Sequence, residues 1–528
     1  MSIPTLLEFA TDKMLTLLLV KERAKCRRRN SSEKHHTLDK ECDIDNLTTR
    51  KKLSRLMPPR YTWVRPSKSK RVKLPNENND TTKNAEKALI LTIKRDEKLR
   101  EGGTTFEYLD ELHAFFDRIR KLLSAKSLTF EQPTLFPILK DIEHQDNGTK
   151  IVTCRPISAY SRLEDKIILA LTSHYLTRYF DRYLHKNILS YRNARDFGNK
   201  KHHVTNFNDG IRLIKDFHKN HQSETIYAAD CDIRNFYDIF PHRVVRECFE
   251  RFLNKSQLSD DGKAQVMKVV NAYLASYNFY ENAWLKTQPD YPAYRTVFSK
   301  VCRRLHDDNH KNIYQFGWPQ ELGSPQSQSD TIGVAQGGSL SLLVANIVLN
   351  DVDQKIVESE DPNRLFIRYC DDMILLHTDF NECCRLMEQY AESLQSHGLH
   401  YHPFRNVSEC GRKEFWHIKS HLPFLWADGD GNCNRYIGFL GYELRRDGRM
   451  RLRKSNIVRF KEKILRISYA IHRYSRNHTR EETLAYQEKV LNGALNGIKF
   501  YKAFNEQQFR RGKQYRYLVK LKEKFTKM

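Results

Sequence analysis

Three acidic residues stand at the ends of strongly apolar segments, where a carboxylate is costly to bury. Asp232 follows the run IYAADC, and Asp371 and Asp372 divide the apolar run LFIRYC from MILL. A carboxylate in such surroundings loses hydration, so it is tolerated when a cation neutralises it. Ligand sets made only of oxygen suit Mg²⁺ or Mn²⁺. Two such ions about 3.5–4 Å apart can activate a hydroxyl and stabilise a phosphate leaving group. The residues therefore predict a two-metal site.

The elements that position these carboxylates follow from the pattern around them. Residues 225–233 predict a short buried strand, and residues 365–377 predict a strand–turn–strand unit with the Asp pair at its tip. A lone Asp-Asp pair would indicate an ordinary acidic turn. Here Gln336 and two glycines precede an apolar helix expected at about 339–357. Glycines in such a turn let the backbone approach a ligand closely.

Five segments in a fixed order resemble the motifs of reverse transcriptases, over roughly residues 150–445. In chain order they are DIRNFYD at 232–238, GVAQGGSLSLLVANIVL at 333–349, YCDD at 369–372, SHGL at 396–399 and FLGY at 439–442. Upstream, RPI at 155–157 and SYR at 190–192 resemble fingers motifs of group II intron-type enzymes. Each motif alone is modest, but five in the right order make a chance match very improbable.

The resemblance implies a role for each matched residue. Asp232, Asp371 and Asp372 are the expected catalytic residues and metal ligands. The expected substrate-binding residues are Tyr237, which excludes a 2′-hydroxyl, Gln336, Gly337, Arg155, which holds the triphosphate, and Ile233, whose carbonyl is a further ligand. The expected nucleic-acid-binding residues are Gly441, Tyr442, Arg451, Arg453 and Lys454. Two alternatives stay open: Tyr237 as a core aromatic, and Arg155 in a surface salt bridge.

The chain also departs from the family pattern. Ala335 and Leu342 occupy positions where group II-type enzymes usually have proline, and Arg405 falls near the lysine expected after the SHGL segment. Arginine does not readily release a proton, so the general acid for pyrophosphate release is an open question.

The composition limits the classes of partner and the cellular compartment that can be expected. The 528 residues carry a formal net charge of +25, which favours a polyanionic partner, most often nucleic acid. The eleven cysteines include no CxxC pair, which is typical of reduced thiols in the cytoplasm. The apolar run Met14–Val20 is too short to span a bilayer, so no membrane partner is expected.

The expected fold is an α+β right-hand polymerase with fingers, a palm of antiparallel strands and helices, a helical thumb and an N-terminal helical extension. The predicted domains are the extension with its basic linker at 1–127, the fingers at 128–225, the palm at 226–445 with an insertion near 241–330, and the basic thumb at 446–528. Residues 57–85, rich in Pro, Lys, Arg and Asn, predict the linker.

The resemblance implies an RNA-directed DNA polymerase that joins dNTPs on an RNA template, with Mg²⁺ or Mn²⁺ as cofactor and DNA as product. Similarity to bacterial retron, abortive-infection and unknown-group enzymes adds an antiphage role and a non-coding RNA or accessory defence protein as partner. Three alternatives remain. YCDD and Tyr237 argue against an RNA-dependent RNA polymerase. A template-independent or protein-primed DNA polymerase and a non-catalytic nucleic-acid-binding scaffold stay open, and the oligomeric state is not predicted.

Overall fold

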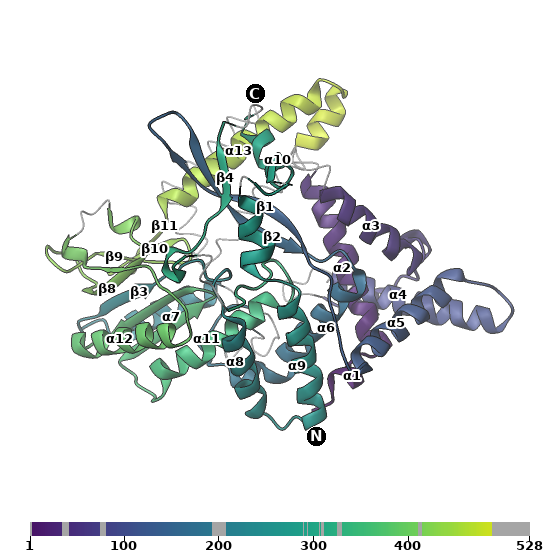
Figure 1. Cartoon of the computed structure of the whole chain (residues 1–528), viewed down its shortest axis with the longest axis horizontal. Coiled ribbons are helices and arrows are strands. Elements are labelled where there is room, and N and C mark those ends of the chain that lie inside the picture. The colour runs from purple at the N-terminus through teal and green to yellow at the C-terminus, as the bar shows by residue number, and fades with distance from the viewer. Residues whose placement is uncertain are drawn as a thin grey trace.

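The computed structural model describes residues 3–33, 42–73, 81–192, 207–288, 290–292, 294–305, 307, 311–324, 330–409 and 414–487. Within them, helices mix with three β-sheets, as the α+β expectation requires (Figure 1). The helices are α1 (Leu6–Phe9), α2 (Asp12–Glu33), α3 (Cys42–Arg55), α4 (Thr81–Glu101), α5 (Glu107–Ser124), α6 (Leu163–Phe180), α7 (Phe207–Asn220), α8 (His242–Asn254), α9 (Asp260–Ala275), α10 (Tyr294–Arg304), α11 (Ser341–Val357), α12 (Phe380–Ser396) and α13 (Lys454–Ser475). The strands are β1 (Thr134–His144), β2 (Lys150–Ala159), β3 (Tyr227–Cys231), β4 (Ile313–Phe316), β5 (Arg364–Tyr369), β6 (Asp372–His377), β7 (Phe404–Arg405), β8 (Ser420–Leu425), β9 (Tyr436–Phe439), β10 (Tyr442–Arg445) and β11 (Met450–Leu452).

A five-stranded sheet has the order β5-β6-β3-β8-β7, and the three predicted carboxylates lie at the ends of its strands. Both of its faces are buried. Ile374 and Leu376 of β6 join the core that includes α7, whereas Met373 and Leu375 join the core that includes α11 and α12. Strands covered on both faces have continuous apolar sequences, which explains the apolar runs around the acidic residues. The strand–turn–strand unit expected at 365–377 is confirmed.

A second sheet pairs the long β1–β2 hairpin with β4, which runs parallel to β2. Strand β4 comes from the segment 241–330, which also supplies α8, α9 and α10. In the sequence, the apolar residues of this segment show little of the regular spacing expected of helices or strands. The buried residues of α9 do repeat at helical spacing, at Val266, Val269, Val270, Tyr273 and Leu274. The helical spacing of apolar residues in α9 could therefore have been recognised in the sequence.

A third, small sheet has the order β11-β10-β9 and leads into α13. Residue 445, near which the sequence predicts a domain boundary, is the last residue of β10, and the sheet continues to Leu452. Helix α13 bears out helical character for the start of the basic C-terminal region. Residues 488–528 of that region lie outside the described part of the chain.

The N-terminal helices form a packed group, in which α2 contacts α3, α4 and α6, and α1 contacts α5 and α9. In Figure 1 this group lies on the side opposite to β8–β11. None of the helices described for this chain has both the length and the apolar character needed to cross a bilayer.

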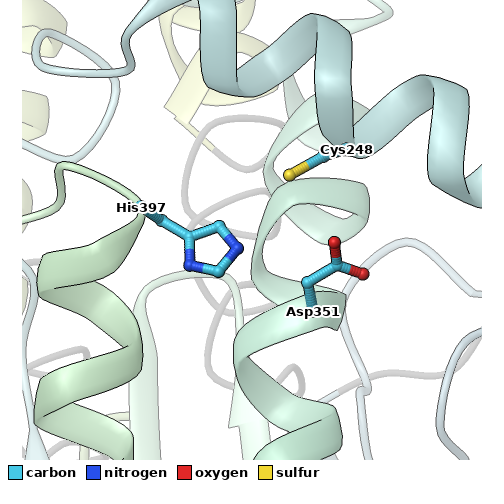
Figure 2. A group of neighbouring side chains, drawn as sticks. All are labelled: Cys248, Asp351 and His397. Carbon is cyan, nitrogen blue, oxygen red and sulfur yellow. The ribbon is translucent and has the colours of Figure 1, made fainter.

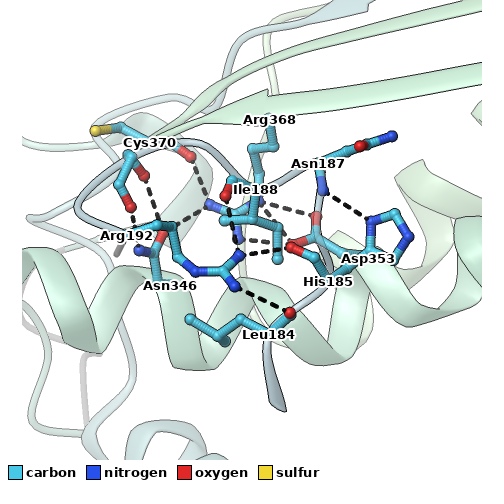
Figure 3. A network of polar contacts seen from close by, with 10 residues as sticks. Leu184, His185, Asn187, Ile188, Arg192, Asn346, Asp353, Arg368 and Cys370 are labelled. Carbon is cyan, nitrogen blue, oxygen red and sulfur yellow. Dashed lines mark hydrogen bonds and ion pairs between the residues drawn. The ribbon is translucent and has the colours of Figure 1, made fainter. Parts of the chain in front are cut away.

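A buried ion pair between Arg368 on β5 and Asp353 on α11 lies directly behind the turn between β5 and β6 (Figure 3). Arg368 Nε donates to the two Asp353 oxygens at 2.9 and 2.8 Å, and Nη2 donates to Oδ2 at 2.6 Å. The remaining nitrogen, Nη1, donates to the Cys370 carbonyl at 2.9 Å and to Asn346 Oδ1 at 3.2 Å. One guanidinium therefore joins a helix, a strand and the turn.

Asn346 extends this network to the SYR segment. Its Nδ2 donates to the Ser190 carbonyl at 2.8 Å, and Ser190 Oγ donates back to Asn346 Oδ1 at 3.0 Å. Arg192 is also buried and is paired with Asp181 at 2.7 Å. Its other donors reach the backbone carbonyls of Asp181, Leu184, His185 and Ile188. Ser190 and Arg192 thus form buried connections beside the sheet, whereas Tyr191 between them is exposed.

Replacing Arg368 by methionine leaves the Asp353 carboxylate buried without its cation. We expect the free energy of unfolding, measured by urea denaturation, to fall by about 3–5 kcal/mol. The double variant with Arg368→Met and Asp353→Leu removes both charges, so it should recover most of that loss. A double variant as unstable as Arg368→Met would contradict this account of the pair.

Candidate active site

The three predicted carboxylates lie at one end of the five-stranded sheet. Strand β3 pairs with β6 so that Cys231 is opposite Met373, which brings the next residue, Asp232, beside Asp372. Asp371 lies in the two-residue turn between β5 and β6. Its neighbour Cys370 has a φ of 57°, a left-handed conformation that a non-glycine residue adopts only when its surroundings fix it. The hydrogen bond from Arg368 to the Cys370 carbonyl supplies that fixation.

Burial and neighbouring negative charges raise the pKa values of Asp371 and Asp372. Burial raises the pKa of Asp371, and the nearby charge of Asp232 raises it further. Burial, followed by the charges of Asp371 and Asp232, raises the pKa of Asp372 to about 7. Part of the Asp372 side chain remains open to solvent, although protein surrounds it densely. This all-oxygen, mutually repelling donor set fits a hard divalent cation, which would relieve the repulsion.

Two basic side chains that the sequence did not assign stand beside Asp232: the ammonium of Lys419 and the imidazole of His402, whose pKa is lowered by burial. Lys419 Nζ lies 3.3 Å from Asp232 Oδ2, and His402 Nε2 lies 3.9 Å from the same oxygen. The backbone N–H of His402 also donates to the Asp232 carbonyl at 3.0 Å. Arg405, which falls near the position of the expected lysine, is exposed on β7 and pairs along the backbone with His421. Among the described residues, Lys419 and His402 are therefore the two basic side chains within 4 Å of this carboxylate.

Ile233 is buried and faces Tyr401 across an isolated antiparallel bridge. The hydrogen bonds of this bridge use its neighbours: the Arg234 N–H donates to the His400 carbonyl, and the Asp232 carbonyl accepts from His402. The Ile233 carbonyl takes part in neither bond.

Gln336 and Gly337 form a turn that contacts both β2 and the segment after β3. The Gln336 carbonyl accepts from the Ser158 N–H at 2.8 Å, and its side-chain amide donates to Asp238 Oδ1 at 2.6 Å. Gly337 has a φ of +88°, and a Cβ there would lie 3.2 Å from Ile157 Cγ2 and 3.4 Å from the Ser158 carbonyl. This position therefore requires glycine for both conformation and space.

Tyr237 lies half-buried beside the same turn. Its carbonyl accepts from the Val334 N–H at 2.8 Å, and its ring packs on Phe236 at 5.0 Å between centroids. The hydroxyl is buried and has no hydrogen-bond partner. Burial raises the pKa of this phenol, and the charges of Cys370 and Asp371 raise it further. The hydroxyl therefore lies within electrostatic range of Asp371 and has no internal hydrogen-bond partner.

Arg155 and Lys140 extend from the β1–β2 hairpin. Arg155 is exposed and has no carboxylate within ion-pair distance among the described residues, although its charge lowers the pKa values of Asp371 and Asp238. Lys140 Nζ donates to Asn235 Oδ1 at 3.1 Å. Burial lowers the pKa of Lys140, and the charge of Asp238 opposes that effect. The hairpin thus brings two positive charges to the carboxylate site.

A cavity of about 100 Å³ connects Asp232 and Asp372 with the turn between β9 and β10. Leu440 and Gly441 form this turn with φ values of 49° and 85°. The Gly441 carbonyl accepts from the Arg453 N–H at 3.0 Å and from Asn456 Nδ2 at 3.1 Å. The start of α13 therefore holds the turn against the carboxylates.

The remaining predicted nucleic-acid residues differ in their surroundings. The side chain of Tyr442 is fully buried. Arg451 forms an ion pair with the buried Glu443, and its guanidinium lies 4.1 Å from the centre of the Tyr436 ring. Arg453 lines the cavity and lies 5.6 Å from the centre of the Trp416 ring, whereas Lys454 is exposed at the first position of α13.

Another set of possible ligands lies away from this site. Figure 2 shows Cys248 on α8, Asp351 on α11 and His397 after α12 pointing toward one another, with ligand atoms all within 4.8 Å. Arg251 already donates to Cys248 Sγ at 3.2 Å and to Asp351 Oδ2 at 2.9 Å. The positive charge of Arg251 therefore already balances the negative charge of Asp351 in this group. In the described part of the chain, no other set of three such residues meets the 4.8 Å spacing, and this includes the set of Asp232, Asp371 and Asp372.

No family model and no curated protein matches the chain. Three solved telomerase structures are similar at low identity. The apo telomerase of Candida tropicalis truncated from its C-terminal domain is 13% identical with a TM-score of 0.30, over 61% of this chain and 55% of that one. The apo telomerase of Candida tropicalis is 12% identical with a TM-score of 0.34, over 76% and 64%. The Candida albicans telomerase in complex with a TWJ fragment of telomeric RNA is 12% identical with a TM-score of 0.32, over 78% and 68%.

Removing the Tyr237 hydroxyl tests whether it is truly without an internal partner. Tyr237→Phe deletes a buried polar group that forms no hydrogen bond, so we expect a melting temperature at least equal to that of the wild type. Differential scanning calorimetry without added ligand is the measurement. A melting temperature several degrees lower would mean that the hydroxyl bonds to the protein itself.

Proposed function

We propose that the chain is an RNA-directed DNA polymerase of the reverse-transcriptase type, with its active site at the turn between β5 and β6. The observation that carries this proposal is the meeting of Asp232, Asp371 and Asp372 at adjacent strand ends, beside positive charges from separate elements. The order of the sequence motifs supports the same assignment.

Asp232 and Asp371 are the residues that hold a pair of Mg²⁺ or Mn²⁺ ions, and Asp372 assists. Bound ions of this kind supply activation of a 3′-hydroxyl and charge stabilisation at the leaving pyrophosphate. Lys419 stands 3.3 Å from Asp232, so it screens the carboxylates and offers a proton donor close to the site. The Ile233 carbonyl, which takes no part in its local bridge, is available as a further ligand.

The groups around the carboxylates are suited to a nucleoside triphosphate. Arg155 presents an exposed guanidinium, which binds phosphate oxygens in pairs. Gly337 lets the turn pack closely against Ile157 and Ser158 of β2, which places the turn beside the carboxylate site. Gln336 fixes that turn through Asp238. Tyr237 lies near Asp371, and in this proposal its ring lies against the sugar and excludes a 2′-hydroxyl.

Gly441 and Arg453, which line the cavity beside Asp232 and Asp372, are the residues we assign to the primer end. Lys454, exposed at the start of α13, is assigned to the phosphate backbone, whereas Arg451 is held by Glu443 and is a weaker candidate. An RNA template, a DNA product, a cytoplasmic location and a role in antiphage defence with a non-coding RNA or accessory protein rest on the sequence resemblance and belong to the same proposal.

Replacing Asp232 or Asp371 by asparagine removes one carboxylate charge from the metal-binding set. We expect primer extension with Mg²⁺ to fall by about 10²–10³-fold or more while the fold is retained. Binding of Mn²⁺, followed by electron paramagnetic resonance, should weaken in parallel.

Asp216→Asn is the matched control, because Asp216 is an exposed carboxylate on α7. It removes the same charge without touching the site. Normal extension by Asp232→Asn or Asp371→Asn, with an unchanged melting temperature, would refute the catalytic assignment.

Tyr237 provides the test of sugar selection. Tyr237→Ala opens the space beneath the sugar, so the ratio of kcat/KM for dNTP to that for rNTP should fall by about tenfold or more. Tyr237→Phe keeps the ring and should keep the wild-type ratio. The same ratio in all three proteins would leave Tyr237 as a core aromatic, and a wild-type preference for rNTP would favour an RNA polymerase.

A further inference from the structure

The basic segment that follows α3 is a fixed strap along α4. The Val64 N–H donates to Thr92 Oγ1 at 2.8 Å. Asn84 forms two bonds with Val72, accepting from its N–H and donating to its carbonyl, each at 2.8 Å. Lys87 Nζ donates to the Lys70 carbonyl at 2.9 Å. Residues 57–73 are therefore anchored to α4 at several points. The composition predicted a linker, and it could not reveal these long-range side-chain bonds.

A cavity of about 470 Å³ opens between this strap and α4. Its volume lies within the usual range for small-molecule sites. The strap contributes three arginines to the lining, and α4 contributes an amide and two small side chains; the six are Arg60, Arg65, Arg71, Asn84, Ala85 and Ala88. Among the residues that the structure describes, the cavity lining includes three arginines and no acidic side chain, so these residues give it a positive field.

The three guanidiniums have no carboxylate partner among the described residues. Arg71 Nε donates only to the Pro66 carbonyl, at 3.2 Å, and Arg60 lies 5.9 Å from the centre of the Trp63 ring. By contrast, Arg95 on the neighbouring turn of α4 is paired with Asp96 at 2.7 Å. Like charges that share a cavity repel one another, and a bound anion removes that repulsion.

Two aromatic residues add a second kind of contact. Tyr61 lines the cavity and is 89% exposed, the highest exposure among the large hydrophobic side chains of the described residues. Trp63 lies at the cavity wall, where its Nε1 donates to the Pro58 carbonyl at 2.9 Å and its ring is nearly buried. Trp63 is thus a fixed wall, whereas Tyr61 is a free ring on which a base can stack.

We propose that this strap cavity binds one or two nucleotides of a single-stranded nucleic acid, with Arg60, Arg65 and Arg71 on the phosphates and Tyr61 under a base. Guanidinium pairs match phosphate oxygens, and an exposed aromatic ring beside them is typical of single-strand recognition. An acidic peptide would use the positive charges and leave the exposed ring without a function. The site does not depend on polymerase activity, because the cavity contains none of the catalytic residues.

The test is binding of a fluorescent single strand of roughly 12 nucleotides, as RNA and as DNA, by fluorescence anisotropy across a salt series in EDTA. The triple variant Arg60→Gln, Arg65→Gln and Arg71→Gln should bind at least about tenfold more weakly, with a log–log salt slope flatter by up to about 2. Tyr61→Leu should weaken binding without changing the slope, and Tyr61→Phe should bind like the wild type. An effect on RNA alone or on DNA alone supports the site and identifies its strand.

The matched control is Lys94→Gln, Lys98→Gln and Lys126→Gln, which removes three positive charges from exposed positions outside the cavity. Equal losses in this control and in the arginine variant would overturn the site in favour of general surface charge. Unchanged binding by the arginine variant, with its melting temperature retained, would also overturn it. The experiment contains no divalent metal and no dNTP, so its outcome is separate from that of the polymerase assays.

Discussion

The buried ion pair of Arg368 and Asp353 is the interaction on which the candidate active site depends. Removing two charges from water is costly, and the attraction between them repays that cost only when every donor and acceptor is satisfied. Here the guanidinium binds both oxygens of Asp353, the side chain of Asn346 and the carbonyl of Cys370. A shift of helix, strand or turn would break one of these bonds. The position of Asp371 is therefore fixed by atoms that never meet a substrate.

The charge distribution sets a second constraint. The protein is strongly basic overall, yet its most concentrated negative charge lies at the ends of β3 and β6. Burial and neighbouring negative charges raise the pKa values of Asp371 and Asp372. The positive charges of Arg155 and Lys419 oppose that effect at Asp371, and those of Arg453 and Lys419 oppose it at Asp372. A divalent cation bound among the carboxylates would relieve the same repulsion.

The sequence predicted those parts of the site that depend on residues close together in the chain. The apolar runs around Asp232 and Asp371 predicted the strands, and the turn at Gly337 predicted the start of α11. Lys419 could not be predicted in the same way, because it reaches Asp232 only through the pairing of β8 with β3. The ion pair of Arg451 was equally hidden: its charge suggested a nucleic-acid contact, and only the hairpin of β10 and β11 reveals that it lies opposite Glu443. Strand register between distant segments is not encoded in composition.

The two candidate sites respond to a polyanion in opposite ways. Without a bound cation, the carboxylates of Asp232 and Asp371 repel phosphate, so the candidate active site contributes little to holding a strand. The guanidiniums of Arg60 and Arg65 on the strap attract phosphate with no cation present. Figure 1 places the strap's helix, α4, on the far side of the molecule from β9–β11. Under the two functions proposed above, the positive charge that would hold a strand is therefore separate from the negative charge that would bind the metal ions.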